Sequence, residues 1–79
     1  MPASNSEVMV KEEFLRMLGE NVARLREEAG LSQTELALRC DKDRQSLNRL
    51  ETGRINPSIF YLSQIAAELK RPVKDLVDF

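Results

Sequence analysis

The segment between residues 42 and 54 concentrates side chains that can form directed hydrogen bonds with a ligand. Its basic residues are Lys42, Arg44, Arg49 and Arg54, and the polar residues between them are Gln45, Ser46 and Asn48. A guanidinium offers several N–H donors in a fixed fork, and a carboxamide offers donors beside an acceptor. Such groups suit an anionic or acceptor-rich partner, although an ordinary solvated helix face would have the same composition.

Catalytic chemistry has no comparable support in the sequence. The chain has no histidine and a single cysteine, Cys40, which excludes a Cys-His zinc site and a serine triad with a histidine base. The pairs Glu12-Glu13 and Glu27-Glu28 are too close in sequence to face one pocket, and no glycine-rich phosphate loop is present. We therefore expect no enzyme activity, metal, cofactor or small-molecule ligand, and we interpret Cys40 as a buried core residue.

Length and composition predict one small helical domain. The chain has 79 residues, of which 42% are hydrophobic, and its formal net charge is −1. Leu, Glu, Arg and Ala favour helix, while the β-branched and aromatic residues are too scattered for a sheet. No run of about 18 apolar residues is long enough to span a membrane, and no secretory signal is recognised. The lone cysteine suits the reducing cytoplasm, which is the predicted location.

Apolar periodicity predicts an extended first helix. We expect a flexible tail over residues 1–7 and one domain over residues 8–79, with a first helix from about Glu7 to Ala29. The apolar stripe of that helix comprises Val10, Phe14, Leu18, Val22 and Leu25. Gly30 supplies the left-handed residue that ends the helix.

Capping residues set the limits of the later helices. Ser32-Gln33-Thr34-Glu35 is a capping box that begins a second helix, which ends near Asp41. Asp43 caps a third helix that ends at Gly53. A fourth helix is expected from Ser58 to Leu69, with a buried face of Ile59, Leu62, Ile65, Ala66 and Leu69, and a short fifth helix from Val73 to about Val77.

The short turn between the second and third helices suggests a function for the basic segment. A turn of about three residues makes the two helices cross steeply, so the third helix projects from the body of the domain. An α-helix fits the major groove of DNA. The exposed side chains of the third helix would be Arg44, Gln45, Ser46, Asn48 and Arg49. Arginine matches the acceptors of guanine, and Gln or Asn matches the donor and acceptor of adenine.

Three motifs in order give the chain a recognisable family pattern. They are Leu18-Gly19-x-x-Val22-x-x-Leu25-Arg26, Gly30-Leu31-Ser32-Gln33-x-Glu35-Leu36-Ala37 and Leu47-x-x-Leu50-Glu51-x-Gly53-x-x-Asn56-Pro57-Ser58. Over residues 14–79 the chain resembles the phage-repressor-like (XRE, Cro/repressor) helix-turn-helix family. The resemblance implies an all-α, compact five-helix domain whose third helix, about residues 43–52, enters the major groove.

The same resemblance implies roles for individual residues. Base-reading residues would be Arg44, Gln45, Ser46, Arg49 and, as a weaker candidate, Asn48. Phosphate contacts would come from Ser32 and Gln33 at the start of helix two and from Thr52, Arg54 and Asn56 at the exit of helix three. Arg26 and Glu51 match a family pair that forms a salt bridge inside the domain.

The chain departs from the family pattern at the turn. A glycine and an apolar residue usually stand where this chain has Asp41 and Lys42. Aspartate can adopt the left-handed conformation of the turn at some cost. Lys42 cannot pack into the core as an apolar residue would, so we expect it to point outward, toward phosphate.

The aromatic residues Phe60 and Tyr61 stand at usually polar positions of the fourth helix. Partial burial and a contribution to a dimer interface are both consistent with them. Val77 and Phe79 at the end of the chain are the first choice for that interface. The predicted function is sequence-specific binding of double-stranded DNA by a homodimeric regulator, a repressor or controller protein, on a pseudo-palindromic operator. The alternative is an antitoxin-type module that masks a partner protein.

Overall fold

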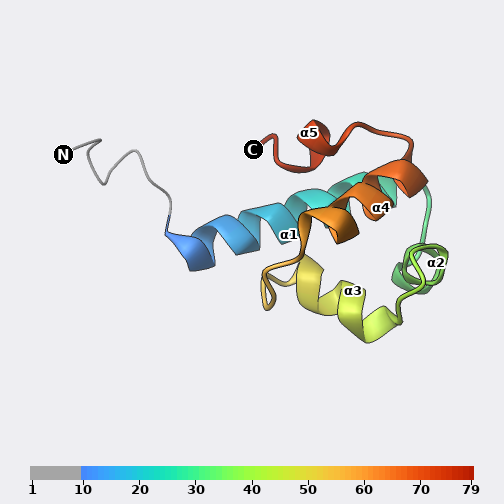
Figure 1. Ribbon diagram of the computed structural model, residues 1–79, viewed down its shortest axis with the longest axis horizontal. Coiled ribbons are helices and arrows are strands. Elements are labelled where there is room, and N and C mark those ends of the chain that lie inside the picture. The colour runs from blue at the N-terminus through green and yellow to red at the C-terminus, as the bar shows by residue number, and fades with distance from the viewer. Residues whose placement is uncertain (1–9) are drawn as a thin grey trace.

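The computed structural model describes residues 10–79, which form five α-helices and contain no strand. The helices are α1 (Lys11–Glu28), α2 (Gln33–Arg39), α3 (Arg44–Glu51), α4 (Ile59–Leu69) and α5 (Val73–Leu76). Figure 1 shows α1 and α4 across the middle of the molecule, with α5 on one side and α3 on the other. The predicted all-α, five-helix fold is confirmed. The tail expected over residues 1–7 lies outside the described residues. The first helix begins at Lys11 instead of about Glu7, because Val10 is extended and forms its N-cap.

The first helix extends beyond its neighbours. Leu18, Val22 and Leu25 are buried as the stripe predicts, but Val10 and Phe14 are 62% and 40% exposed. Their part of α1 projects past α3 and α4 (Figure 1), and Phe79 packs against Phe14 there without burying it. Leu15 contributes to the core in their place. The apolar stripe therefore continues onto the surface of the molecule at Val10 and Phe14.

Local capping chemistry fixes the two short helices. The Ser32 hydroxyl accepts from the Glu35 amide at 3.0 Å, and the Glu35 carboxylate accepts from the Ser32 amide at 2.9 Å. Asp43 caps α3 by accepting from the Ser46 amide at 2.8 Å. Asp41 lies between the helices with φ 59°, the left-handed conformation expected there. The turn therefore closes without the usual glycine.

The fourth helix buries a different face from the one predicted at its first turn. Ser58 caps it by accepting from the Tyr61 amide. Ile59 is 70% exposed, whereas Tyr61 is only 6% exposed and belongs to the core. The prediction of Ile59 as a core residue is wrong, and of the two alternatives for Tyr61 burial holds and not a dimer contact. Both residues have helical spacing to the buried Leu62 or Ile65, so periodicity alone could not choose between them.

Two glycines allow α1 and the end of α3 to meet at backbone distance. A Cβ atom on Gly19 would lie 2.4 Å from the Leu50 carbonyl oxygen and 2.5 Å from that of Glu51. Gly53, with φ 74°, would bring a Cβ atom within 2.9 Å of the Arg16 Cα atom. Only glycine tolerates both the conformation and the contact at residue 53. The C-terminal end of α3 is thus fixed against α1.

Candidate nucleic-acid interface

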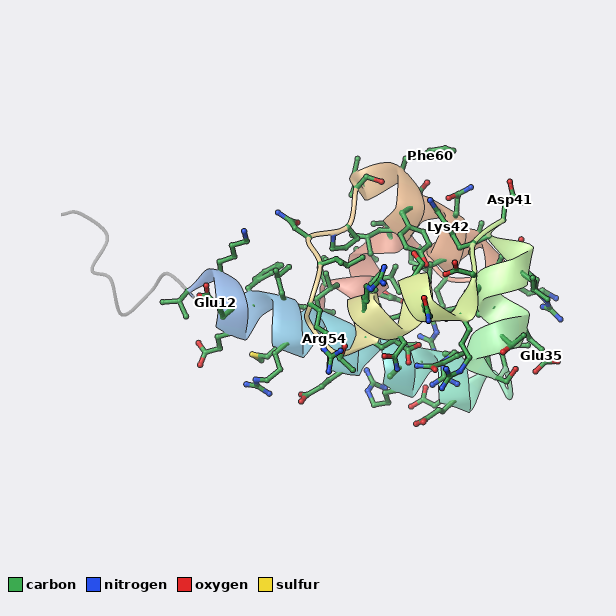
Figure 2. All side chains as sticks on the ribbon, turned by 90° about the horizontal axis from the view of Figure 1, so that it is seen from below. Glu12, Glu35, Asp41, Lys42, Arg54 and Phe60 are labelled. Carbon is green, nitrogen blue, oxygen red and sulfur yellow. The ribbon has the colours of Figure 1, made fainter. Side chains whose placement is uncertain are left out.

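The outward face of α3 carries polar residues that surround one hollow. Arg44, Gln45, Asn48 and Arg49 line it together with Arg54 from the following loop, and its volume is about 290 Å³. Leu47 and Leu50 lie on the opposite face of the helix and are fully buried. Figure 2 views the side of the molecule that carries α3, with Arg54 near one end of α3 and Asp41 and Lys42 near the other.

The hollow is strongly cationic. Within residues 10–79, the ion pairs involve arginines 16, 24, 26 and 71, and none involves Arg44, Arg49 or Arg54. Three guanidiniums therefore line the same hollow, and no carboxylate of the described residues forms an ion pair with any of them. Because like charges repel in a shared site, the arrangement favours a partner that supplies anions or hydrogen-bond acceptors.

A buried ion pair links α1 to the C-terminal end of α3. The Arg26 Nε donates to the Glu51 Oε2 at 2.7 Å, and the Arg26 Nη2 donates to the Glu51 Oε1 at 3.1 Å. Arg26 also donates to the Leu31 carbonyl at 2.7 Å, and Gln33 donates to the Glu51 Oε1 at 2.9 Å. The hydrogen bond to Glu51 raises the pKa of Arg26 despite the opposing effect of burial. This network ties α1 and α2 to the last residue of α3.

Ser46 points away from the hollow. It is half-buried, does not line the hollow, and lies on the side of α3 that faces Tyr61. The Tyr61 hydroxyl is buried and has no hydrogen-bond partner. Burial raises the pKa of Tyr61, and the nearby Ser46 side chain offsets part of that rise without reaching hydrogen-bond geometry. Among the five base-reading candidates, Ser46 alone is thus separated from the others.

The predicted phosphate contacts differ in what they can still donate. The Ser32 hydroxyl accepts within its capping box and keeps its own proton available, whereas the Thr52 hydroxyl already donates to the Asn48 carbonyl at 2.7 Å. Gln33 is half-buried and commits one N–H to Glu51. Lys42 is exposed, as expected, and its ammonium lies 5.1 Å from the centre of the Tyr61 ring. Asn56 is also exposed.

Comparison with known proteins decides the class of this interface. The model of the helix-turn-helix family matches residues 22–76, which is more than half of the chain. The chain belongs to this helix-turn-helix family. It is a DNA-binding transcriptional regulator of the phage-repressor-like (XRE, Cro/C1) class, with α2 and α3 as the two helices of the motif.

Several individual proteins resemble this helix-turn-helix regulator. The uncharacterised HTH-type transcriptional regulator y4dJ of Sinorhizobium fredii is 43% identical over 54 residues, which cover 68% of this chain and 70% of that protein. The crystal structure of the restriction-modification controller protein C.AhdI from Aeromonas hydrophila has a TM-score of 0.76 and 31% identity, covering 78% of this chain and 94% of the controller. The crystal structure of the clp gene regulator ClgR from C. glutamicum has a TM-score of 0.78 and 26% identity, covering 81% of this chain and 82% of that regulator.

Two exposed apolar surfaces of this helix-turn-helix domain lie outside the hollow. Phe79 packs against Phe14, with ring centres 5.2 Å apart, and Val77 is exposed close by in sequence. Phe60 is 69% exposed beside Ile59 at the start of α4, where Figure 2 shows it pointing away from the helices. Phe14 belongs to the apolar stripe of α1 and is 40% exposed, so spacing alone did not decide between the core and the surface. Among the described residues, no helix is long and apolar enough to cross a membrane.

Proposed function

We propose that this regulator binds a specific operator by placing α3 in the major groove. The hollow lined by Arg44, Gln45 and Arg49 carries this proposal, because one helix face presents an amide and guanidiniums that pair with no carboxylate of residues 10–79. The buried contacts of Glu51 and Gly19 support it further, since they set the angle of α3 to the rest of the domain. The guanidiniums would donate to guanine, and Gln45 and Asn48 would donate to and accept from adenine.

Residues around α3 would hold the DNA backbone. The free hydroxyl proton of Ser32 and the ammonium of Lys42 are the best placed of the phosphate contacts, because both remain available for an external acceptor. Gln33 would contribute its remaining amide proton and Asn56 its exposed carboxamide, whereas Thr52 would first have to release the hydroxyl proton that it donates to Asn48. These contacts position the protein and carry no sequence information of their own.

The active species would be a homodimer on a pseudo-palindrome. The contacting pair Phe14 and Phe79, with the exposed Val77 two residues before Phe79, is the candidate contact between copies, because these apolar side chains are exposed and a second copy would cover them. The C2 symmetry of such a dimer would place two α3 helices about 34 Å apart, one turn of DNA. The resemblance to a restriction-modification controller supports a small regulator of the repressor or controller type. The cytoplasm stays the predicted location.

Selection from a pool of randomised duplexes tests the proposed function. The protein should enrich one sequence pattern, and binding to the enriched duplex should weaken steeply as salt concentration rises. Enrichment of no pattern at any salt concentration would contradict sequence-specific recognition.

The base-reading residues are tested on the selected duplex. Arg44→Ala and Gln45→Ala should each weaken specific binding by ~1–3 kcal/mol and affect unrelated DNA less, because each removes contacts to base edges. Fluorescence anisotropy with the selected duplex and a scrambled duplex measures both effects. Equal losses of affinity on the two duplexes would mean that these residues contact the DNA backbone instead of base edges.

A further inference from the structure

Arg54 lies in the hollow of α3, although its place in the sequence, one residue past Gly53, suggests a contact to the DNA backbone. It forms one wall of the hollow, and Arg44, Gln45, Asn48 and Arg49 form the rest. The side chain is exposed, and no carboxylate of residues 10–79 pairs with it. Its guanidinium therefore shares the space available to the α3 side chains.

The backbone holds Arg54 at this place. The Arg54 amide donates to the Arg49 carbonyl at 2.8 Å, and the left-handed Gly53 turns the chain back toward α3. Gly53 itself packs against the backbone of α1 at Arg16, so the loop cannot move away freely. A fixed backbone limits the region that the Arg54 side chain can reach, so less conformational freedom is lost when it binds.

We propose that Arg54 is a specificity-determining residue that donates to a base edge in the hollow, with guanine the best-matched base. A fork of parallel N–H donors matches the N7 and O6 acceptors of guanine in the major groove. Because Arg44 and Arg49 line the same hollow as Arg54, the three side chains together favour several neighbouring guanines, with their acceptor-rich edges, over a single base. The inference rests on the proposed function, because the hollow faces bases only when α3 occupies the groove.

The test compares Arg54→Lys with Arg54→Ala. Lysine keeps the positive charge that attracts phosphate but lacks the planar fork that reads guanine. Both variants should lose roughly ten- to hundred-fold affinity for the duplex selected by the unmodified protein. On a scrambled duplex, Arg54→Lys should stay within about three-fold of the unmodified protein, because a phosphate contact tolerates either cation.

A second measurement locates the base that Arg54 reads. Binding of the full chain is measured on a set of duplexes that change each base pair of the selected site in turn. Arg54→Ala should abolish discrimination at one guanine and leave the other positions unchanged, while Arg49→Ala, as the comparison, should flatten a different position. Circular dichroism checks that each variant keeps its helices.

The outcomes separate the inference from the function beneath it. The inference is overturned if the base preferences at the selected site are the same with and without the Arg54 side chain and the losses of affinity are equal on all duplexes. The proposed function then still stands. A protein that selects no site at all overturns both, and the unmodified chain alone reveals that result.

Discussion

At the scale of single residues, Tyr61 is a core residue whose polar atom lacks a partner. The hydroxyl is buried without a hydrogen bond, and its ring lies beneath Lys42 at the turn between α2 and α3. A buried hydroxyl without a partner keeps its desolvation cost. Tyr61→Phe should therefore leave the free energy of unfolding unchanged or raise it by up to about 1 kcal/mol, measured by urea denaturation. A loss of more than about 1 kcal/mol would show that the hydroxyl is satisfied.

The same substitution has a signature in alkaline solution. Burial raises the pKa of Tyr61 above its ordinary value of 10.0, so the folded state resists losing that proton. The neutral phenol contributes its full stabilisation of the fold while the pH is below the pKa of Tyr61 in the unfolded chain. That contribution declines as the pH rises through the pKa of Tyr61 in the folded protein. The parent should therefore lose stability relative to Tyr61→Phe above about pH 10. A constant difference between the two proteins across that range would contradict this expectation.

Glu51 is the residue on which the buried hydrogen bonds converge. Its carboxylate accepts from Arg26 and Gln33, and its side chain is 4% exposed. Glu51→Ala leaves the Arg26 guanidinium buried without its partner, so we expect a loss of about 3–5 kcal/mol in the free energy of unfolding. The matched control is Glu20→Ala, which breaks one exposed pair with Arg16 and should cost less than about 1 kcal/mol. Similar losses for both variants would mean that the Arg26 pair is solvated.

At the scale of elements, the angle of α3 depends on backbone contact with α1. A Cβ atom on Gly19 would meet the Leu50 and Glu51 carbonyl oxygens at 2.4 and 2.5 Å, so Gly19→Ala must push the end of α3 away. We expect a destabilisation of about 1–3 kcal/mol, and weaker binding to the selected duplex because α3 shifts. Gly30→Ala is the control: it meets nothing within 4 Å and carries only the strain of φ +76°. Gly30→Ala should weaken DNA binding only to the extent that it lowers the fraction of folded protein.

The elements also show which features a sequence can predict. The caps at Ser32, Asp43 and Ser58 and the left-handed Asp41 depend on a few neighbouring residues, and all were predictable. Whether Ile59 or Tyr61 enters the core depends on what packs against the first turn of α4. The Tyr61 ring lies beneath Lys42, at the turn between α2 and α3, and Lys42 itself stays outside the core. The candidate site divides in the same way: helical spacing predicted the shared face of α3, but the place of Arg54 in the hollow required the fold of the following loop.

At the scale of the whole molecule, the projecting end of α1 meets the end of the chain. Phe14 from α1 and Phe79 after α5 contact each other, and both remain 40% exposed. A small domain that leaves aromatic side chains exposed gains stability when a second copy covers them. Figure 1 shows α5 and α3 on opposite sides of α1, so a second copy that pairs on the α5 side would leave the hollow open to DNA.

Charged substitutions on this surface should separate the copies. We expect Phe79→Asp and Val77→Asp to shift the protein from dimer to monomer in sedimentation equilibrium, because a carboxylate in an apolar contact is costly to desolvate. Phe60→Asp, on the exposed start of α4, is the matched control and should remain dimeric. On DNA, the separated variants should protect single half-sites, whereas the parent protects two half-sites about one helical turn apart. If Phe60→Asp alone dissociates the dimer, the interface lies on α4, and a parent that is monomeric on its operator would contradict the dimer altogether.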